Sequence, residues 1–516
     1  MALFQYLSKA FVVLLPIAIL ALAYLWLRRL QDLRTRSKGC PLPPGPPGEP
    51  ILGHLRVVPS HSPEYTYIEW SKKYKSDILS VNILGQNVII LNSVQAAQDL
   101  LSKRGANYSD RPRFVLFEVM GWGKTLTFLR WGDDFRLHRQ ILQSNFAQSS
   151  IARYRPIQLR ETAVMLNGIL DSEKEWDNTI RRFATAVVLA IGFGIKVKSN
   201  DDKFIKIAED ASYALGHGGA PAGTPVDFFP LLRYMPRWLH DRSLKFANDH
   251  RFAIENLHNK PYEDVMEIEN KTESLMQIMI DLQKREGSKL SSDDIKGAAG
   301  AVFAAGQDTT WATLIVFTLN MLLHPEVQRK AQQALDAVVG RHRLPTFEDR
   351  SQLPYLDRIV QETLRWCPVS PIGVPHRSLE DDFYKEYFIP AGSFVYANAR
   401  AMTHDENTYR NPDDFNPDRY APEAEGGFGE PFPVGQFGFG RRVCVGQHLA
   451  EASVWIVVAS VLSTMNIEHK LDENGNKIVP EVSLTNGLTS HPKDVTCRFV
   501  PRDSQSVEVI RNAKLH

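Results

Sequence analysis

The chain of 516 residues is predicted to fold as an α-rich α+β protein. Residues 150–370 show a mostly helical spacing of apolar residues, broken by loops near 216–225 and 256–261. Strand signals come in small groups on either side of this block, so the order of elements does not fit a doubly wound sheet.

Two groups of strands are expected. Residues 51–100 indicate strands with a short helix, including a β-hairpin over 77–91 that turns at 85–87. In the C-terminal third, Asn474-Gly475 is a strong signal for a second tight turn between short strands.

The composition excludes several classes of protein. With 60 Lys plus Arg against 59 Asp plus Glu, the chain has no excess positive charge to favour nucleic acid as a partner. Hydrophobic residues at 43% and charged residues at 23% exclude a wholly disordered chain. The four cysteines are too scattered for a disulfide scaffold or a zinc finger, so a special cysteine is expected to be a ligand or a nucleophile. They are Cys40, Cys367, Cys444 and Cys497.

The N-terminal region predicts a transmembrane signal anchor at residues 10–27, after a short lumenal segment at 1–9. Residues 10–27 carry no charge, and as a helix they would span roughly 27 Å, close to the thickness of a bilayer's hydrocarbon core. A cleaved signal peptide with its site near 21–23 is the alternative, but the apolar run continues and is followed by Arg28-Arg29. The basic residues after the span predict a cytosolic body.

Residues 28–50 are predicted to form a basic and proline-rich hinge, and residues 51–516 one catalytic body. Six of the ten residues at 41–50 are proline, which favours an extended and stiff spacer. A ligand for an SH3-type domain is the alternative interpretation of this run.

The strongest local signal is the stretch FGFGRRVCVG at 437–446. A glycine turn around a buried structural thiol is one interpretation. A dinucleotide fingerprint is excluded, because Val443 stands where the third glycine should be. The glycines permit close approach to a flat cofactor, and the helix expected at 447–462 would direct its N-terminus at the sulfur of Cys444.

With these residues the sequence resembles the heme-thiolate monooxygenases of the cytochrome P450 family. The resemblance rests on Phe437, Gly440, Arg442, Cys444 and Gly446. It implies the cytochrome P450 fold, a helical domain with a small β-sheet region, and heme b as the cofactor. It also implies that Cys444 is the axial ligand of the iron and that Arg442 pairs with a heme propionate.

A second motif is Glu362-Thr-Leu-Arg365, within a helical run at 356–366. Alone it would be an ordinary surface ion pair. Here FNPDRY follows at 415–420, and the resemblance implies that Arg419 joins Glu362 and Arg365 in a buried charge cluster. Within that stretch, Asp418 and Tyr420 stand where Glu and Phe are commoner in the family.

A third motif is AAGQDTT at 304–310, within an apolar helix expected over 293–323. A kinked core helix with satisfied hydroxyl groups is the alternative interpretation. The resemblance implies an oxygen-activation groove, in which Gly306 opens the helix and Asp308 and Thr309 relay protons to bound dioxygen.

The resemblance supplies two more partners for the heme propionates. Arg139 ends the stretch WGDDFRLHR at 131–139, in which Phe135 stands where tryptophan is usual. His376, in the stretch VPHR, occupies the remaining position.

These motifs follow the family's order over roughly residues 40–500, and the anchor resembles its microsomal eukaryotic branch. The stretches at 374–377 and 496–501 are most similar to fungal members of secondary metabolism. We therefore expect a single-pass protein of the endoplasmic reticulum membrane with a cytosolic catalytic domain. It would insert one atom of O2 into a small lipophilic substrate of terpenoid, aromatic or polyketide type.

Electrons from NADPH are expected to arrive through NADPH–cytochrome P450 reductase, docked at Arg136, Arg441 and Arg442. The substrate pocket is expected to have an apolar lining. Its predicted lining is 114–128, Val302, Ala305, 371–374 and 484–488. A heme-thiolate isomerase or dehydratase without external electrons, and a non-catalytic heme-binding protein, are the alternatives.

Overall fold

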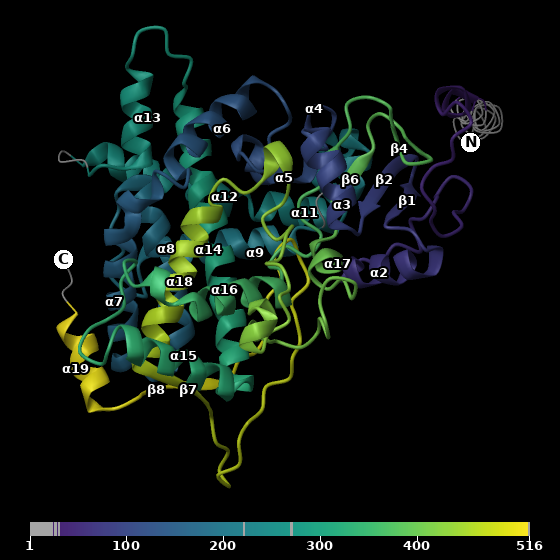
Figure 1. Ribbon diagram of the computed structural model, residues 1–516. Helices are drawn as coiled ribbons and strands as arrows, with labels where there is room; N and C mark the ends of the chain where they lie inside the picture. Colours follow the sequence, from purple (N-terminus) through teal and green to yellow (C-terminus); the bar gives the residue numbers. More distant parts are fainter. Residues whose placement is uncertain (1–23, 25–27, 29–30, 220–221, 269–271, 514–516) are drawn as a thin grey trace.

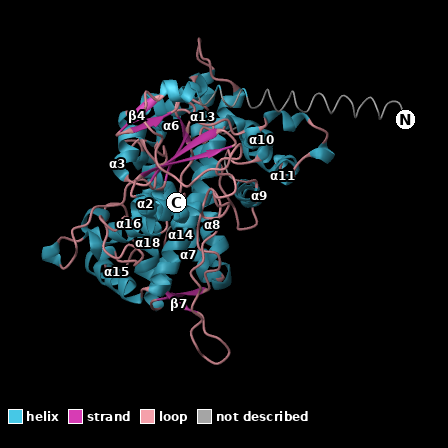
Figure 2. Cartoon of the chain, turned by 90° about the vertical axis from the view of Figure 1, so that its right-hand side faces the viewer, coloured by secondary structure: helices cyan, strands magenta, loops and turns pink. Residues whose placement is uncertain are grey.

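The computed structural model describes residues 24, 28, 31–219, 222–268 and 272–513. Helices make up most of the body, and most strands gather at one end of it, whereas β7 and β8 lie at the other end (Figures 1 and 2). The predicted α-rich α+β class is therefore confirmed for the described residues.

The main sheet contains four strands in the order β1-β2-β6-β3. β1 is antiparallel to β2, β2 is parallel to β6, and β6 is antiparallel to β3. Two further pairs, β4 with β5 and β7 with β8, are antiparallel. The strands are Ile78–Ile83 (β1), Gln86–Leu91 (β2), His376–Arg377 (β3), Asp382–Tyr384 (β4), Tyr387–Ile389 (β5), Phe394–Ala397 (β6), Met465–His469 (β7) and Cys497–Pro501 (β8).

The predicted hairpin of β1 and β2 is confirmed, but its turn lies earlier than expected. Ile83 pairs with Gln86, which leaves Leu84 and Gly85 as the two turn residues. Their φ angles are 49° and 86°, as a two-residue turn of the hairpin type requires. Asn87, placed in the turn from the sequence, is therefore already part of β2. The turn predicted at Asn474-Gly475 is also present, since Leu471 and Lys477 pair across it.

The long central helix α14, Ser292–Leu323, confirms the apolar helix expected over 293–323. Ser291 caps its first turn through a capping box with Asp294. Helices pack around most of its surface, above all α8, and also α9, α12, α16 and α18. An apolar sequence on all sides suits a helix surrounded in this way.

One sequence-based expectation was wrong. The loop predicted near 256–261 is absent, because α12 runs unbroken over Arg251–Glu267 with Pro261 inside it. An interior proline costs a helix about 3 kcal/mol. The buried side chains of Ala253, Ile254 and Leu257 secure the helix against α9 and α14 despite that cost. The loop predicted near 216–225 is confirmed, since α9 ends at His217 and α10 begins at Pro225.

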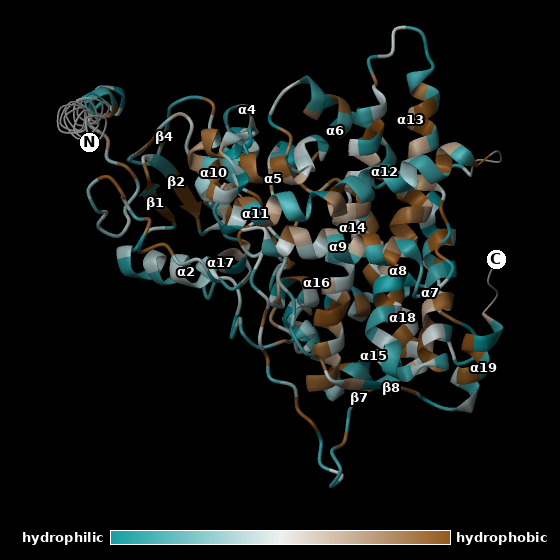
Figure 3. Cartoon of the chain, turned by 180° about the vertical axis from the view of Figure 1, so that it is seen from behind, coloured by the Kyte–Doolittle hydropathy of each residue, from teal (hydrophilic) through white to brown (hydrophobic). Residues whose placement is uncertain are grey.

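Hydrophobic residues occur along the helices of the body (Figure 3), and many of them form one large buried core cluster. The remaining α-helices complete the described body, some around α14 and others beside the sheet. They are Pro63–Tyr74 (α2), Val94–Ala97 (α3), Gly105–Tyr108 (α4), Val115–Met120 (α5), Asp133–Phe146 (α6), Arg155–Asp171 (α7), Trp176–Phe193 (α8), Lys203–His217 (α9), Pro225–Phe228 (α10), Arg242–Asp249 (α11), Leu275–Gln283 (α13), Pro325–Val338 (α15), Pro354–Trp366 (α16), Ala399–Thr403 (α17), Gln447–Thr464 (α18) and Ser504–Asn512 (α19).

The proline-rich segment lies against the sheets rather than projecting from them. The Phe388 amide donates to the Pro41 carbonyl at 2.8 Å, and the Ser80 amide donates to the Pro44 carbonyl at 2.9 Å. Ahead of it, the Arg36 guanidinium pairs with Asp381 beside β4. Apart from Tyr24, the predicted anchor at 10–27 lies outside the described residues. Within the described part of the chain, no helix combines the length and apolar character needed to cross a bilayer.

Candidate active site

The Cys444 thiol lies at the start of α18, whose first residue is Gln447. The Cys444 amide donates to the Phe437 carbonyl at 2.8 Å, which closes the loop between these residues. Burial raises the pKa of the thiol, while the backbone N–H groups of Gly446 and Gln447 and the charge of Arg139 act to lower it. Cys444 lies deep in the molecule and is nevertheless exposed, so its side chain faces an internal hollow.

Gly440 fixes this loop against the rest of the body. Its φ is 58°, and an added Cβ would lie 2.0 Å from the Leu101 carbonyl oxygen, so only glycine fits there. Gly446 has open space around it, and Phe437 packs against the main hydrophobic core. The loop therefore holds its form through Gly440 and the Cys444 hydrogen bond.

Arg442 points inward and has unused hydrogen-bond donors. Its Nε donates to the Ser109 carbonyl at 2.7 Å, and its guanidinium carbon lies 3.6 Å from the centre of the Phe135 ring. Its Nη1 and Nη2 are buried without a hydrogen-bond partner among the described residues. Buried donors are normally paired, so this position calls for an acceptor that the described part of the chain does not supply.

Three more basic side chains lie near Arg442, and they are Arg111, Arg139 and His376. Burial, together with repulsion from Arg111, lowers the pKa of Arg442 to about 8 and lowers that of His376 well below its usual value. Asp110 is the acidic neighbour that opposes the effect on Arg442. This excess of buried positive charge fits an anionic group between these side chains.

Arg111 was missed by the sequence reasoning. It is 5% exposed, and its Nη1 donates to the Val374 and Pro375 carbonyls at 2.6 and 2.9 Å. The segment 110–113 carries no helical or strand pattern that would have singled it out, and its partners lie far along the chain. The contact also fixes the backbone just ahead of His376.

Arg139 and His376 are both held by backbone carbonyls. Arg139 donates from Nη1 to Val443 at 2.6 Å, which ties α6 to the Cys444 loop. The Nδ1 atom of His376 lies 2.7 Å from the Tyr108 carbonyl oxygen, leaving Nε2 as the ring's other polar atom.

Helix α14 also has an open position within the core of the molecule. Within α14, which the structure describes throughout, Ala305 is the one exposed residue between 294 and 323, although the helix crosses the core. The Thr309 hydroxyl donates to the Ala305 carbonyl at 2.7 Å, so its lone pairs remain free to accept. Both positions therefore face open space at the middle of the helix.

The other residues of this motif point elsewhere. An added Cβ on Gly306 would lie 2.5 Å from Val188 Cγ1, so Gly306 permits close packing of α8 on α14 rather than opening the helix. Gln307 donates to the Ser212 hydroxyl of α9 at 2.5 Å. Asp308 is 8% exposed, and among the described residues its carboxylate forms no hydrogen bond with Thr309 or any other side chain.

The chain next to two of the predicted pocket-lining segments, 371–374 and 484–488, is joined by a hydrogen bond. The Ser490 amide donates to the Val369 carbonyl at 2.7 Å, which joins the C-terminal loop to the segment after α16. Phe117 and Phe128 contact each other edge to face with ring centres 4.8 Å apart. A surface pocket of about 480 Å³ adjoins these rings, but its lining includes neither Cys444 nor Thr309.

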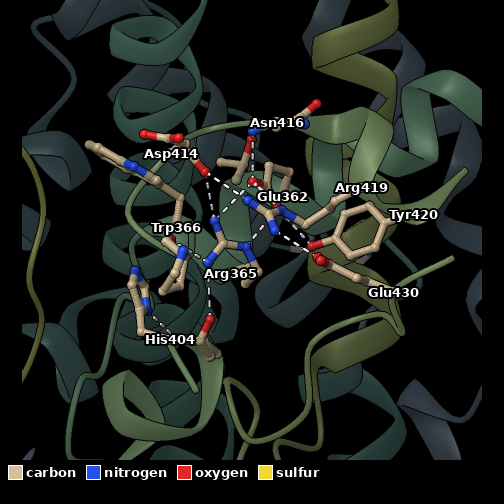
Figure 4. Close-up of polar contacts among 12 residues, drawn as sticks. Glu362, Arg365, Trp366, His404, Asp414, Asn416, Arg419, Tyr420 and Glu430 are labelled. Atoms are coloured by element: carbon tan, nitrogen blue, oxygen red, sulfur yellow. Dashed lines mark hydrogen bonds and ion pairs between the residues drawn. The ribbon is translucent and has the colours of Figure 1, made fainter. Parts of the chain in front are cut away.

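The predicted charge cluster is present and fully buried (Figure 4). Arg365 donates to both carboxylate oxygens of Glu362 at 2.7 and 2.9 Å, and Arg419 Nε donates to the same carboxylate at 3.0 Å. Two further members were not predicted as such. Glu430 accepts from Arg419 at 2.7 Å, and the Tyr420 hydroxyl donates to Glu362 at 2.8 Å.

The predicted reductase face requires one correction. Arg442 is 9% exposed and its side chain points toward the hollow, so it does not contribute to an outer surface. Arg136 and Arg441 are exposed, and their guanidinium carbons lie 5.7 and 5.2 Å from the Trp131 ring.

Together these features define a class of site that combines a thiol at a helix N-terminus, buried basic donors without a partner among the described residues, and a core helix with an accepting hydroxyl. The two unpartnered Arg442 nitrogens fit the carboxylates of a heme, and the free thiol fits its iron. The site is therefore that of a heme-thiolate enzyme.

Comparison with known proteins agrees with this class. A family model described as Cytochrome P450 matches residues 43–496. A cytochrome P450 monooxygenase of Armillaria gallica is 36% identical over 95% of this chain and 97% of its own length. Cytochrome P450 monooxygenase 176 of Postia placenta is 38% identical over 92% of each chain. Tryptamine 4-monooxygenase of Psilocybe cyanescens is 34% identical over 91% of this chain and 94% of its own length.

The chain belongs to the cytochrome P450 family. It is a monooxygenase of the fungal type, its cofactor is heme, and the ligand class of the iron is a cysteine thiolate.

Proposed function

We propose that Cys444 is the axial thiolate and that the chain oxidises a small lipophilic substrate in the hollow between Cys444 and Ala305. The observation that carries the proposal is the geometry of Cys444 and Arg442. The thiol faces the hollow at a helix N-terminus, and the Arg442 nitrogens are buried without partners among the described residues. When bound, the heme supplies the iron chemistry that activates O2.

The chain's own residues would hold the cofactor and manage protons. Arg111, Arg139 and Arg442 would supply positive charge for the two propionates, and His376 is proposed as the remaining propionate partner. Thr309 is the proposed proton-positioning residue, since its hydroxyl donates to Ala305 and keeps its lone pairs for a water that delivers protons. Asp308 is the proposed source of protons from the solvent side.

The proposed substrate is apolar and compact. Aromatic side chains dominate the loop predicted to line the pocket, and Phe114, Phe117 and Phe128 are each less than 9% exposed. Walls of this kind bind a substrate through the apolar surface that it buries rather than through charged groups. A terpenoid, aromatic or polyketide scaffold of fungal secondary metabolism fits this lining.

Electrons are proposed to come from NADPH through a flavoprotein reductase. Arg136 and Arg441 lie exposed on the side of the molecule that carries the Cys444 loop, and both flank Trp131. Acidic groups of the reductase would pair with them, so the rate of reduction should fall with added salt.

The protein is proposed to be held at the endoplasmic reticulum membrane by residues 10–27, with its body in the cytosol. A second feature supports contact with a bilayer. Leu231, Tyr234 and Trp238, in the segment after α10, are 78%, 71% and 75% exposed. Large apolar side chains gathered in this way are typical of a membrane or protein contact.

The test is reconstitution of the purified protein with reductase, NADPH and lipophilic fungal metabolites. A monooxygenase consumes NADPH and O2 in step with oxidised product. An isomerase or dehydratase would form product without NADPH, and a non-catalytic heme protein would form none; either result contradicts the proposal.

A further inference from the structure

The buried charge cluster contains four charged side chains rather than the three predicted from the sequence. Glu362 and Glu430 carry the negative charges, and Arg365 and Arg419 the positive ones. All four side chains are at most 6% exposed. Without Glu430, two buried arginines would share a single carboxylate, and one positive charge would remain uncompensated.

Tyr420 completes the hydrogen bonding of Glu362. The Oε1 atom of Glu362 accepts from the backbone N–H of Asn416 at 2.8 Å and from Arg419. Its Oε2 atom accepts from Arg365 and from the Tyr420 hydroxyl at 2.8 Å. Phenylalanine could pack in the same place but could not make this bond. The aromatic ring of Tyr420 contacts Phe432 edge to face at 4.9 Å between ring centres.

Both residues connect the cluster to the chain that leads into the Cys444 loop. The Glu430 amide donates to the Arg419 carbonyl at 2.9 Å, and the Glu430 carboxylate accepts from the Arg410 amide at 2.8 Å. Glu430, which lies shortly before Phe437 in the sequence, is therefore bonded to the chain at both Arg410 and Arg419. Phe432, which touches Tyr420, lies between Glu430 and Phe437 in the sequence.

We propose that Glu430 and Tyr420 are positioning residues for the Cys444 loop. They neutralise and complete the buried cluster, and through Phe432 they hold the segment that sets the position of the thiol. This inference rests on the proposed role of Cys444 as the axial ligand.

The experiment compares Glu430→Gln and Tyr420→Phe with the matched control Glu425→Gln. Glu425 lies in the same stretch of chain and forms an ion pair with Arg358 at 3.0 Å, but its side chain is 59% exposed. Each purified holoenzyme is titrated with denaturant, and the rate of its heme loss is followed at one fixed denaturant concentration. The long-wavelength Soret band of the reduced carbonyl complex reports the thiolate ligand, and far-ultraviolet circular dichroism reports the helices.

Loss of Glu430 leaves an uncompensated buried charge, so Glu430→Gln should lose its heme at least about 10-fold faster than wild type. Tyr420→Phe removes one hydrogen bond to a charged group and should accelerate heme loss about 5-fold to 10-fold. In both variants the Soret band should disappear at a lower denaturant concentration than the helical signal, and Glu425→Gln should match wild type.

The inference is overturned if the Soret and helical signals shift together, which would indicate a purely global effect, or if both variants match Glu425→Gln. Should Glu430→Gln not fold, Tyr420→Phe decides the outcome, because it removes only a hydroxyl. A failure of the underlying assignment is distinguishable, since Cys444→Ser would then keep the Soret band.

Discussion

At the scale of single residues, the site combines groups that are anchored by a hydrogen bond to a backbone carbonyl with groups that lack a partner among the described residues. The Thr309 hydroxyl and the His376 ring are already bound to carbonyl groups, at Ala305 and Tyr108. The two outer nitrogens of Arg442 have no partner among the described residues. The first kind fixes geometry, and the second indicates where the cofactor's carboxylates bind.

Replacement of Thr309 by alanine tests the proposed proton positioning. Without the hydroxyl, no side chain at this point of α14 accepts a hydrogen bond from the delivering water. Coupled turnover should fall by about 10²–10³-fold, the range for a positioned proton-transfer group. NADPH consumption should continue, hydrogen peroxide should accumulate, and heme binding should be unchanged.

The neighbouring hydroxyl of Thr310 could substitute after a small shift, so the double change Thr309→Ala with Thr310→Val is included. Thr318→Val is the matched control, because Thr318 makes the same bond to the carbonyl four residues earlier, at 2.8 Å, deeper in the core. If the double variant couples NADPH consumption to product formation as well as wild type does, the proposed role of Thr309 in positioning protons is wrong.

His404 gives a prediction for the pH dependence of stability. Burial, with repulsion from Arg400 and Arg365, lowers its pKa to about 2 in the folded protein. In the unfolded chain the His404 ring has its ordinary pKa of about 6.5 and binds a proton more readily than in the folded protein. The contribution of neutral His404 to the free energy of unfolding is therefore fully present above about pH 6.5 and decreases as the pH falls below that value. At pH 5 the loss should reach about 2 kcal/mol.

Denaturant unfolding of wild type and His404→Gln at pH 7.5 and pH 5 measures this contribution. The variant's free energy of unfolding should fall by about 2 kcal/mol less than that of wild type between the two pH values. Equal losses in the two proteins would show that His404 does not titrate in this way.

At the scale of elements, local patterns predicted what lies along one helix or one hairpin. The helices that carry Glu362, Thr309 and the residues after Cys444 were all predicted correctly. Contacts between distant segments were not visible in those patterns. Arg111 meets Val374 only after folding, and Pro261 stays in a helix because of packing on its neighbours.

The close packing of α12 on α14 gives a prediction with a built-in control. An added Cβ on Gly300 would lie 2.3 Å from Cδ2 of His258. That ring is held by the Ile254 carbonyl and the Thr125 hydroxyl, so it has no room to retreat. Gly300→Ala should therefore destabilise the protein by about 1–3 kcal/mol.

Gly216→Ala is the control in another helix, since nothing lies within 4 Å of its added Cβ. It should instead stabilise the protein by up to about 1 kcal/mol, because alanine suits helix interiors better than glycine. Thermal or denaturant unfolding measures both. A Gly300→Ala variant as stable as wild type would mean that α12 and α14 separate at little cost.

At the scale of the whole molecule, the predicted fold of the body is confirmed, and its placement at a membrane stays a prediction. The family resemblance predicted a cluster of Glu362, Arg365 and Arg419, and the structure brings these residues together. The prediction did not include Glu430, because a lone glutamate in a loop has no periodic signal in the sequence. Tyr420 was noted as a variation, and its bond to Glu362 needed the fold to become apparent.

Membrane attachment is tested by deleting residues 1–27. The full chain should stay with microsomal membranes through alkaline carbonate washing, because an inserted apolar helix resists that treatment, whereas the deleted form should be released. A deleted form that resists washing as well as the full chain would assign attachment to another segment, such as the exposed residues around Trp238.

The sequence has an N-glycosylation sequon at Asn107, but the orientation of the body across the membrane needs a different marker. We expect that sequon and the one at Asn270, outside the described residues, to stay unmodified in a cytosolic body. The side chain of Asn107 already accepts from the amides of Leu379 and Glu380 at 2.9 and 2.7 Å, which would itself hinder modification. Protection from added protease in sealed microsomes distinguishes the two orientations, and a protected body would reverse the proposed topology.

The central claim is that Cys444 supplies the thiolate to the heme iron, and the Soret band of the reduced carbonyl complex tests it most directly. Cys444→Ser should lose the long-wavelength band while keeping its helical circular dichroism, because serine has no comparable thiolate to donate. Cys40→Ser, at a half-buried position away from the loop, is the control and should keep the band. An unchanged band in Cys444→Ser would contradict the assignment.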